Sequence, residues 1–513
     1  MKRKEFLKKG VTVMIGLSGM TALLNACAKK TNESAQNDDD KGGDPGANTG
    51  GVTLSATHWV SASATGSGTG TQQNPYTLAQ ALQLAQPGWR VSCGPGEYMG
   101  ANTNSNTPSL RILANGTQNN PIIFFAQNYA ALKTTGRSIL RHNGTQQGYG
   151  CPVLGLDTGH HWYGFYITES LAPTHPDTGP IVCGGKYNRI SYFRIDRGPV
   201  TWPQERADNN HAAIRFEGLN GCQNNLVSDC WIENYSRENA FGSEQGVQLF
   251  SPQGSNITTS TGRITIENCY FDNVETALTS KGAGATRPLL GGIIFRRNLV
   301  RGSAFANVVG AVNFMDTSGE LGRNQVYQNI QVGGHYHVIC MNQAGYTIRD
   351  IDVINNTLIN CVANREREGI HTSTPMAGTS GSGWRIHNNI KTGSAPLFNF
   401  AYDGQSDAAV QSRSHNLSFG HTRWGYVDSR GTGTQSLAQW VANTPFDDFS
   451  LETDPQLTSS VWGNANLGKL QQASPARNAA IDLLNLNGNG TSAVCNMGAY
   501  SNDNVVIGIR PLT

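Results

Sequence analysis

Short aliphatic segments recur along this chain at a loosely kept spacing. They are centred on Val153, Ile181, Ile214, Val247, Leu278, Val312, Ile339, Ile370 and Leu397, and neighbouring centres lie 27 to 34 residues apart. A second series keeps the same spacing, with apolar centres at Val227, Ile266, Phe295, Val326, Ile354 and Ile386. Apolar and polar residues alternate with a period of two in these segments, which is typical of β-strands. Two strand series with one shared spacing predict a solenoid in which each repeat forms one coil.

The composition supports many short strands and argues against two other repeat folds. Of the 513 residues, 60 are glycine and 14% are charged, whereas an average globular protein has roughly 25% charged residues. Gly and Asn crowd the repeats, which disfavours a helical repeat, and a β-propeller needs longer repeats than these. The net charge of +2 gives no indication of a nucleic-acid partner. The sequence therefore predicts an all-β solenoid.

The alternation also predicts which side chains face the interior of each coil. Val247 is expected to point inward and its neighbour Gln248 outward, so that only Val247 would be sensitive to a polar substitution. Cys230 and Cys269 occupy equivalent positions on consecutive coils. We expect them to form an internal stack of small buried residues and not a reactive pair.

Motifs at both ends of the mature chain resemble those of a known superfamily. They are Trp59-Val60-Ser61, Asn74-Pro75-Tyr76-Thr77-Leu78 and Gly94-Pro95-Gly96-Glu97-Tyr98 near the start, and Ser474-Pro475-Ala476 and Met497-Gly498-Ala499-Tyr500 near the end. Together with the repeats, they resemble the right-handed parallel β-helix proteins common among polysaccharide lyases and glycoside hydrolases. The resemblance implies an all-β, right-handed parallel β-helix with a short N-terminal capping helix at Leu78–Ala85. The motifs are specific for the fold and leave the chemistry open.

The first 26 residues have the features of a secretion signal. A basic beginning is followed by an apolar stretch over residues 11–24, shorter than the roughly 20 residues of a transmembrane helix. It ends in Leu24-Asn25-Ala26-Cys27, which resembles the lipobox of bacterial lipoproteins and implies that Cys27 is lipidated. An ordinary signal peptide with a chance cysteine is the alternative.

The chain beyond the signal divides into two parts. Residues 27–52 lack apolar periodicity and are expected to be the lipidated Cys27 and a disordered tether. Residues 53–513 are expected to form one β-helix domain. We therefore expect an exported monomer that a lipid holds to the membrane of the cell envelope, at the outer membrane or the cell surface.

Outward positions of the central coils carry a group of ionisable side chains. The position after each inward aliphatic residue holds Arg215, Gln248, Asn313 and His371, and Glu217 and Lys281 follow two residues later. Three residues before the inward aliphatic position lie His211, Glu244, Glu275 and Arg367, with the small residues Ala213, Gly246, Ala277 and Ala311 between the columns. This pattern predicts a trough with a floor of small residues and charged walls, which suits a polysaccharide. The alternative is that these positions are polar because they meet water.

Each of these residue types has a chemical reason to lie in such a trough. A β-eliminating lyase needs a base to take the proton next to a uronate carboxyl group, and a cation to stabilise the enolate that forms. Lys281 or His371 is the candidate base, and Arg215 is the candidate for holding the carboxylate. Glu244 and Glu275 are candidate ligands of Ca²⁺, which prefers oxygen and would also favour a neutral Lys281. The candidates for substrate binding are His211, Gln248, Asn313 and Arg367.

The segment Val274–Lys281 resembles the glutamate-then-lysine stretch of the chondroitinase B and alginate lyase family. The resemblance implies that Lys281 is the base and Glu275 a calcium ligand. The sequence departs from the family pattern at Ala277, where a second glutamate could help. The next coil has Asn313 and Met315 but no Arg-His pair.

Two other functions stay open beside a lyase that acts on an acidic polysaccharide. In a glycoside hydrolase, Glu244 and Glu275 on adjacent coils would lie roughly 5 Å apart, the separation of a retaining pair. A non-catalytic protein of the cell envelope that binds glycan would need only the polar trough.

Overall fold

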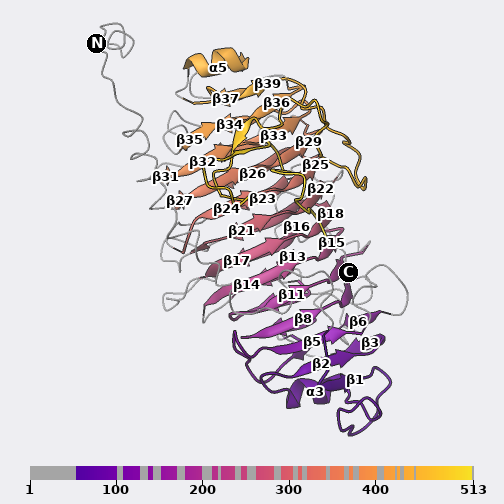
Figure 1. The fold of residues 1–513 in the computed structure, drawn as a ribbon. Coiled ribbons are helices and arrows are strands. Elements are labelled where there is room, and N and C mark those ends of the chain that lie inside the picture. The colour runs from indigo at the N-terminus through magenta and orange to yellow at the C-terminus, as the bar shows by residue number, and fades with distance from the viewer. Residues whose placement is uncertain are drawn as a thin grey trace.

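The protein is described here by a computed structural model. It covers residues 54–510 apart from 101–107, 128–136, 142–151, 170–178, 199–210, 218–220, 237–243, 251–260, 282–289, 304–309, 315–320, 342–346, 363–368, 374–379, 401–409, 422–423, 428–431 and 444–445. In this part the strands form three long sheets that run side by side along the molecule (Figure 1). We call the three sheets A, B and C. The chain passes through them in this order and then begins the next coil beside the previous one, so that the neighbouring strands of successive coils are parallel. The fold is a right-handed parallel β-helix, which confirms both the solenoid that the repeats predict and the β-helix that the resemblance implies.

The strands of each sheet are given in the order in which they pair. Sheet A contains β1 (His58–Val60), β2 (Arg90–Cys93), β5 (Ile122–Ala126), β8 (His160–Tyr163), β11 (Arg189–Ser191), β14 (Cys222–Ser228), β17 (Thr261–Glu267), β21 (Ile294–Arg296), β24 (Asn324–Tyr327), β28 (Ile351–Ile354), β32 (Trp384–His387) and β35 (Val410–Ser414), with β20 (Leu290–Gly291) also beside β17. Sheet B contains β3 (Gly96–Met99), β6 (Ser138–Arg141), β9 (Tyr166–Thr168), β12 (Arg194–Asp196), β15 (Trp231–Glu233), β18 (Tyr270–Val274), β22 (Leu299–Gly302), β25 (Ile330–Val332), β29 (Thr357–Ile359), β33 (Ile390–Thr392), β36 (Leu417–Phe419) and β39 (Leu451–Glu452). Sheet C contains β4 (Leu110–Arg111), β7 (Leu154–Leu156), β10 (Ile181–Cys183), β13 (His211–Phe216), β16 (Glu244–Phe250), β19 (Thr276–Lys281), β23 (Gly310–Phe314), β26 (Tyr336–Met341), β30 (Gly369–Ser373), β34 (Phe398–Phe400), β37 (Gly425–Val427) and the antiparallel β38 (Thr432–Gln435). Two small pairs complete the strands, β27 (Thr347–Arg349) with β31 (Ser380–Ser382) and β40 (Ala480–Ile481) with β41 (Val494–Cys495).

The turn from sheet A to sheet B has a common form on successive coils. One residue of the turn has a left-handed backbone, with φ between 54° and 61° at Asp229, Asn268, Asn355 and Asn388. Asp and Asn tolerate this conformation better than most residues with a side chain. The next residue of the chain then points into the core.

An asparagine ladder occupies these inward positions on the upper coils. Its members are Asn298, Asn329, Asn356, Asn389 and Asn416, all fully buried. The side-chain Nδ2 of every ladder asparagine except the last, Asn416, donates to the Oδ1 of the next asparagine at 3.0 or 3.1 Å. The backbone N–H of the same donor residue also donates to that Oδ1. Because buried amides need partners, the ladder fixes the spacing of the coils at this corner. Cys230 and Cys269 take the same position on earlier coils and are fully buried, which confirms the expected internal stack.

The register of sheet C agrees with the sequence prediction in the central coils. Ile181, Ile214, Val247, Leu278 and Val312 pair in one row. At three other coils the prediction was wrong by one residue, because the row continues through Leu154, Val338 and Phe398 and not through Val153, Ile339 and Leu397. In the second series, which is sheet A, Val353 takes the place predicted for Ile354.

The small residues do not form the floor of a trough. Ala213, Ala277 and Ala311 lie in the hydrophobic core, and a Cβ added at Gly246 would lie 2.6 Å from the ring of Phe271, which is also in the core. The pairing of β13 with β16 skips Ala213 and Gly246, so the period-two alternation fails there. This part of the sequence prediction was wrong.

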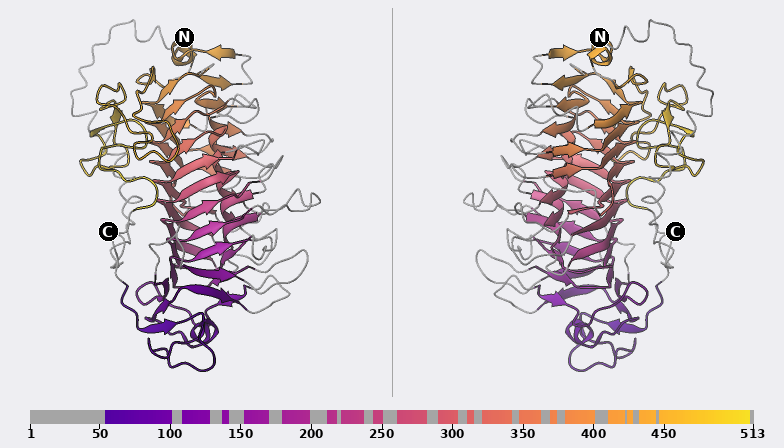
Figure 2. Two further views of the ribbon diagram at one scale, coloured as in Figure 1. Left: turned by 90° about the vertical axis from the view of Figure 1, so that its right-hand side faces the viewer. Right: turned by 90° about the vertical axis from the view of Figure 1, so that its left-hand side faces the viewer.

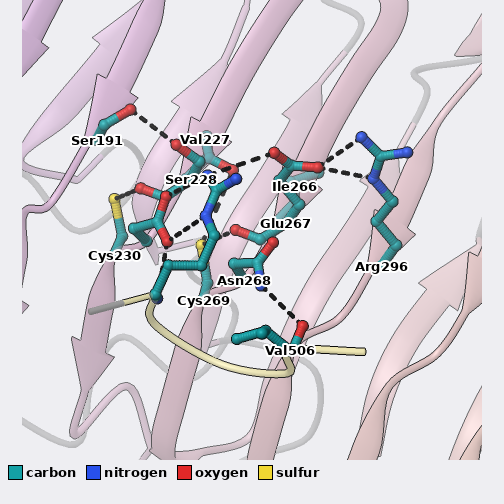
Figure 3. A network of polar contacts seen from close by, with 12 residues as sticks. Ser191, Val227, Ser228, Cys230, Ile266, Glu267, Asn268, Cys269, Arg296 and Val506 are labelled. Carbon is teal, nitrogen blue, oxygen red and sulfur yellow. Dashed lines mark hydrogen bonds and ion pairs between the residues drawn. The ribbon is translucent and has the colours of Figure 1, made fainter. Parts of the chain in front are cut away.

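The C-terminal segment folds back along the corner between sheets A and B, as the yellow ribbon in Figure 2 shows. Asn388 Nδ2 donates to the Ile481 carbonyl at 2.7 Å, and further along the coils Gln328 Nε2 donates to Ser501 Oγ at 2.9 Å. At the far end Asn268 Nδ2 donates to the Val506 carbonyl at 3.1 Å, within the network of Figure 3. The segment thereby covers this corner over the central coils.

Two helices complete the described residues. Helix α3 (Leu78–Leu84) lies at the N-terminal end, where Thr77 and Gln80 form a capping box and Leu78 and Leu82 join the core. Helix α5 (Leu437–Asn443) lies at the other end of the solenoid (Figure 1). Within the described part of the chain, no helix has the length and apolar character needed to cross a membrane.

Replacing Asn356 by leucine tests the asparagine ladder. The change leaves Asn329 Nδ2 and Asn389 Oδ1 buried without their ladder partners, at roughly 1–3 kcal/mol each. We expect the free energy of unfolding in urea to fall by about 2–5 kcal/mol. The exposed Asn504 is the control, since Asn504→Leu should change stability by about 0.5 kcal/mol or less. Equal losses in the two variants would contradict a stabilising role for the ladder.

Candidate functional site

A cluster of buried ionisable side chains lies at the corner between sheets B and C in the central coils. The residues, here called the corner cluster, follow a strand of sheet B or begin a strand of sheet C. They are Glu169, Arg197, His211, Tyr235, Glu244 and Glu275, and none is more than 3% exposed. Such a density of buried ionisable groups is more typical of functional sites than of a hydrophobic core.

Glu169 holds one half of the corner cluster together. Its carboxylate lies 2.9 Å from His211 Nε2 and accepts a hydrogen bond from the hydroxyl of Tyr235 at 2.5 Å. The rings of His211 and Tyr235 stack with their centroids 5.7 Å apart. Two donors therefore converge on one carboxylate, which fixes the orientation of the imidazole.

Glu244 holds the other half. Its carboxylate lies 3.1 Å from the guanidinium of Arg197, which also donates to the Ser236 carbonyl at 3.0 Å. The backbone N–H of Glu244 donates to Glu275 Oε2 at 3.2 Å. The structure therefore brings together three residues that the sequence singled out, His211, Glu244 and Glu275.

The charges in this cluster shift one another's pKa values. Burial by itself would raise the pKa of Glu169, but the charge of His211 and the hydrogen bonds from His211 and Tyr235 outweigh it and lower that pKa. Burial would likewise lower the pKa of His211, but the Glu169 carboxylate outweighs it and raises that pKa. Burial, followed by the charge of Glu169, raises the pKa of Tyr235. A charged Glu169–His211 pair is thus the favoured state near neutral pH.

Two carboxylates of the corner cluster, Glu244 and Glu275, are the predicted calcium ligands. Among the residues that the structure describes, no group of three His, Cys, Asp or Glu side chains is placed to hold a metal ion. Glu244 faces the guanidinium of Arg197, and Glu275 accepts from a backbone N–H, whereas Ca²⁺ takes six to eight oxygen ligands. Calcium binding by Glu244 and Glu275 stays a prediction, and no step below depends on it.

A second group of polar residues lies at the other end of the same strands, on the outer face of sheet C. The guanidinium of Arg215 lies 4.2 Å from the centre of the Phe250 ring and 2.8 Å from the carboxylate of Glu217. Phe250 pairs in register with Lys281 on the next strand, and Lys281 is half-buried. We call Arg215, Glu217, Phe250 and Lys281 the cationic face. Arg215 is itself buried, at 6% exposed, with its guanidinium against the Phe250 ring, so Phe250 lies between two basic residues on the neighbouring strands, of which Lys281 is the more accessible.

Three predicted substrate-binding residues are less accessible than the sequence indicated: His211 of the corner cluster, Gln248 and Asn313. Gln248 and Asn313 lie in one row with Arg215 and Thr279, as predicted. Gln248 is nevertheless fully buried and Asn313 is 4% exposed. Neither amide atom of Gln248 has a hydrogen-bond partner in the described part of the chain. The expectation that Gln248 is an exposed outward residue was therefore wrong, because its amide lies in a closed environment.

The corner cluster and the cationic face are separated by the length of a strand. Glu275 precedes β19 and Lys281 ends it, so their Cα atoms lie roughly 20 Å apart at about 3.3 Å per residue. A cation bound at Glu275 would act only weakly on Lys281 over that distance. The structure does not support the expected link between a metal at Glu275 and the basicity of Lys281.

Three predicted residues lie partly or wholly outside the described chain. Cys27 and Arg367 fall outside it. His371 pairs in register with Ile339 in the row of Arg215, as the strand pattern requires, but its side chain is not described.

Sequence reasoning missed three members of the corner cluster, Glu169, Arg197 and Tyr235. All three follow short strands of sheet B, β9, β12 and β15. A third repeat in the sequence could have located them. An inward isoleucine recurs at the centre of Tyr166-Ile167-Thr168, Arg194-Ile195-Asp196 and Trp231-Ile232-Glu233, the strands that these residues follow. The two series traced along the sequence belong to sheets A and C, so the ends of sheet B were not compared.

The charged Glu169–His211 pair makes a prediction about stability and pH. Because the pKa of His211 is raised in the folded state, its contribution is complete below the unfolded value near 6.5 and is lost as pH rises through the folded pKa. Because the pKa of Glu169 is lowered, its contribution is present above its ordinary value of 4.5 and is lost as pH falls through the folded pKa. The melting-temperature difference between wild type and His211→Asn should therefore be largest between about pH 4.5 and 6.5.

His387 provides a control with the opposite sign. Burial lowers its pKa to about 4, so its contribution is present above pH 6.5 and is lost as pH falls towards 4. The difference between wild type and His387→Asn should shrink towards acid pH, while that of His211→Asn should shrink towards alkaline pH. Parallel profiles for the two variants would show that the Glu169–His211 pair is not charged.

Comparisons with known proteins find similar folds at low sequence identity. No protein-family model matches the chain, and no curated protein matches it. Among solved structures, pectate lyase Pel9A is 13% identical, with 87% of this chain and 97% of that chain covered and a TM-score of 0.46. A rhamnogalacturonan lyase is 15% identical over 82% of this chain and 97% of that one, with a TM-score of 0.42. The GH136 lacto-N-biosidase from Eubacterium ramulus is 12% identical over 77% of this chain and 67% of that one, also with a TM-score of 0.42.

Proposed function

We propose that this protein is an exported polysaccharide-degrading enzyme, a β-eliminating lyase that acts on a uronate-containing glycan. The observation that carries the proposal is the cationic face, where Arg215, Phe250 and Lys281 meet on three consecutive strands of sheet C. An aromatic ring between basic side chains suits an acidic sugar, because the ring packs against the apolar face of the sugar and the cations attract its carboxylate.

Each residue of the cationic face has a separate task in the proposed reaction. Arg215 binds the uronate carboxylate and stabilises the enolate that forms when the neighbouring carbon loses its proton. Lys281, in its neutral form, takes that proton. The electrons of the broken C–H bond form the new C=C bond as the glycosidic C–O bond breaks. The ammonium group of Lys281 then returns the proton to the departing oxygen.

The corner cluster acts in this proposal by positioning. It holds the first residues of β13 and β16, His211 and Glu244, in a network of ion pairs and hydrogen bonds. Arg215 and Phe250 lie further along the same two strands. A fixed start to each strand keeps the reacting side chains in register.

The Lys281→Ala variant tests the catalytic proposal. Wild-type protein incubated with polygalacturonate, alginate, chondroitin and rhamnogalacturonan should produce the ultraviolet absorbance of an unsaturated uronate from at least one of them. Loss of the base should reduce that rate at least about 100-fold, with a nearly unchanged melting temperature because Lys281 is half-buried at a strand end. Lys469→Ala is a matched control, since Lys469 is also half-buried but lies in the C-terminal segment. A Lys281→Ala enzyme that keeps the wild-type rate would remove Lys281 from the mechanism.

One observation favours a glycoside hydrolase as the second candidate. Glu244 and Glu275 lie close enough for the N–H of one to donate to the carboxylate of the other, and paired carboxylates are the machinery of glycoside hydrolysis. New reducing ends without ultraviolet absorbance would support this candidate. If neither signal appears with any polymer, a non-catalytic glycan-binding protein is favoured.

The proposed export includes a lipid anchor at Cys27. The Cys27→Ser variant, expressed in a bacterial host that processes lipoproteins, should move from the membrane fraction to the soluble fraction, because the thiol that carries the lipid is gone. The readout is the distribution of the protein between the two fractions after ultracentrifugation. If Cys27→Ser stays with the membranes as the wild type does, lipidation is the wrong explanation.

A further inference from the structure

A polar pocket lies beside sheet C on earlier coils than the cationic face. It has a volume of about 280 Å³, and its lining includes Arg111, Asn115, Asp157, Gly184, Gly185 and Lys186. These residues follow or end the strands β4, β7 and β10, on the side from which the chain leaves sheet C. None of them belongs to the site described above.

Strand register connects this pocket to the cationic face. Leu156, Cys183 and Phe216 pair in one row, which continues through Leu249 to Ser280. The residues that follow these five form the next row, and they are Asp157, Gly184, Glu217, Phe250 and Lys281. Since neighbouring strands lie about 4.8 Å apart, Gly184 lies roughly 14 Å from Lys281 along the solenoid axis. That distance is the length of a short oligosaccharide.

The charges in the pocket favour an anionic group. Arg111 makes two hydrogen bonds to the Asp157 carboxylate, at 2.7 and 3.0 Å, so these two charges balance each other. The ammonium group of Lys186 has no ion-pair partner among the described residues. The pocket therefore carries one positive charge in excess, at a half-buried position.

Two glycines line the pocket, each for a different reason. A Cβ added at Gly185 would lie 2.1 Å from the Asp157 carbonyl oxygen, so the backbones of two coils approach closely there. At Gly184 the nearest atom to an added Cβ would be the Glu217 carbonyl oxygen at 3.5 Å, an ordinary contact. Gly184 therefore leaves space on the outer face without being required by the backbone.

We infer that this pocket is a distal subsite that binds a uronate residue of the same glycan chain that the cationic face cleaves. The inference rests on the proposed function and extends it. The glycan runs along the solenoid axis, from Lys281 over Phe250 and Glu217 to Gly184, and Lys186 binds the carboxylate of the residue that reaches the pocket. Arg111 and Asp157 line the subsite and offer hydrogen bonds to sugar hydroxyl groups.

Two substitutions test the subsite in different ways. Lys186→Ala removes the unbalanced charge, and Gly184→Leu fills the pocket at a position where a Cβ fits. Binding of the full-length protein is measured by its retardation in native gels that contain polygalacturonate, alginate, chondroitin or rhamnogalacturonan, with hydroxyethyl cellulose as the uncharged control. Lys469→Ala is the control for loss of a lysine. We expect each pocket variant to bind the retarding polymer roughly tenfold more weakly, as for loss of one charge-assisted hydrogen bond, with unchanged melting temperatures.

The outcomes separate the subsite from the reaction. Weaker binding of the polymer, together with unchanged cleavage or binding of a disaccharide too short to span both sites, supports the subsite. Retardation of both variants equal to that of the wild type would overturn the subsite and leave the lyase proposal standing. Failure of every acidic polymer to retard the wild-type protein would overturn the subsite, and it would overturn the lyase proposal as well only if none of these polymers gave the ultraviolet absorbance of an unsaturated uronate.

Discussion

The parallel pairing of each coil with the next is the constraint on which the whole structure depends. Within the three long sheets, the strands between the two ends hydrogen-bond to the equivalent strand one coil before and one coil after, so a residue gained or lost inside a strand would disturb the register of its neighbours. The asparagine ladder enforces the same spacing at the corner between sheets A and B. From β8 onwards the connections between sheets A and B are short, so that variation in the length of a coil there lies in the connections that enter and leave sheet C; on an earlier coil, residues 127–137 separate β5 from β6. Side chains on the outer face of sheet C thereby form rows, and both proposed sugar-binding positions belong to one such row.

The corner cluster is difficult to explain as a device for stability alone. Burying charged groups costs free energy that their mutual attraction repays only when the geometry is close to ideal. Some charged pairs of the protein, such as Arg296 with Glu267, lie where water still reaches them in part. Glu169 and Glu275 are fully buried, as are the paired side chains of Arg413 and Asp447 on a later coil. The free-energy cost of burying these groups is explained if the same groups also position the strands that carry a reaction site.

The fold could be predicted from the sequence because the repeats record it directly. The errors in register occur where two apolar residues are adjacent, as in Val153-Leu154, Val338-Ile339, Val353-Ile354 and Leu397-Phe398, because alternation cannot decide which of the two points inward. The trough with small residues failed for a related reason, since Ala213 and Ile214 both lie in the core. The gathering of His211, Glu244 and Glu275 could be predicted because all three occupy one column. Their partners Glu169, Arg197 and Tyr235 could not be found without tracing sheet B, and no pattern in the sequence indicated that Gln248 is buried.

The central claim is that this solenoid cleaves an acidic glycan by elimination across the cationic face. Mass spectrometry of the products from the four acidic polymers tests it most directly, because elimination and hydrolysis leave products that differ by one water molecule. The account predicts oligosaccharides that are lighter by one water than the corresponding hydrolysis products. Products of the full hydrolytic mass, or no products from any of these polymers, would contradict it.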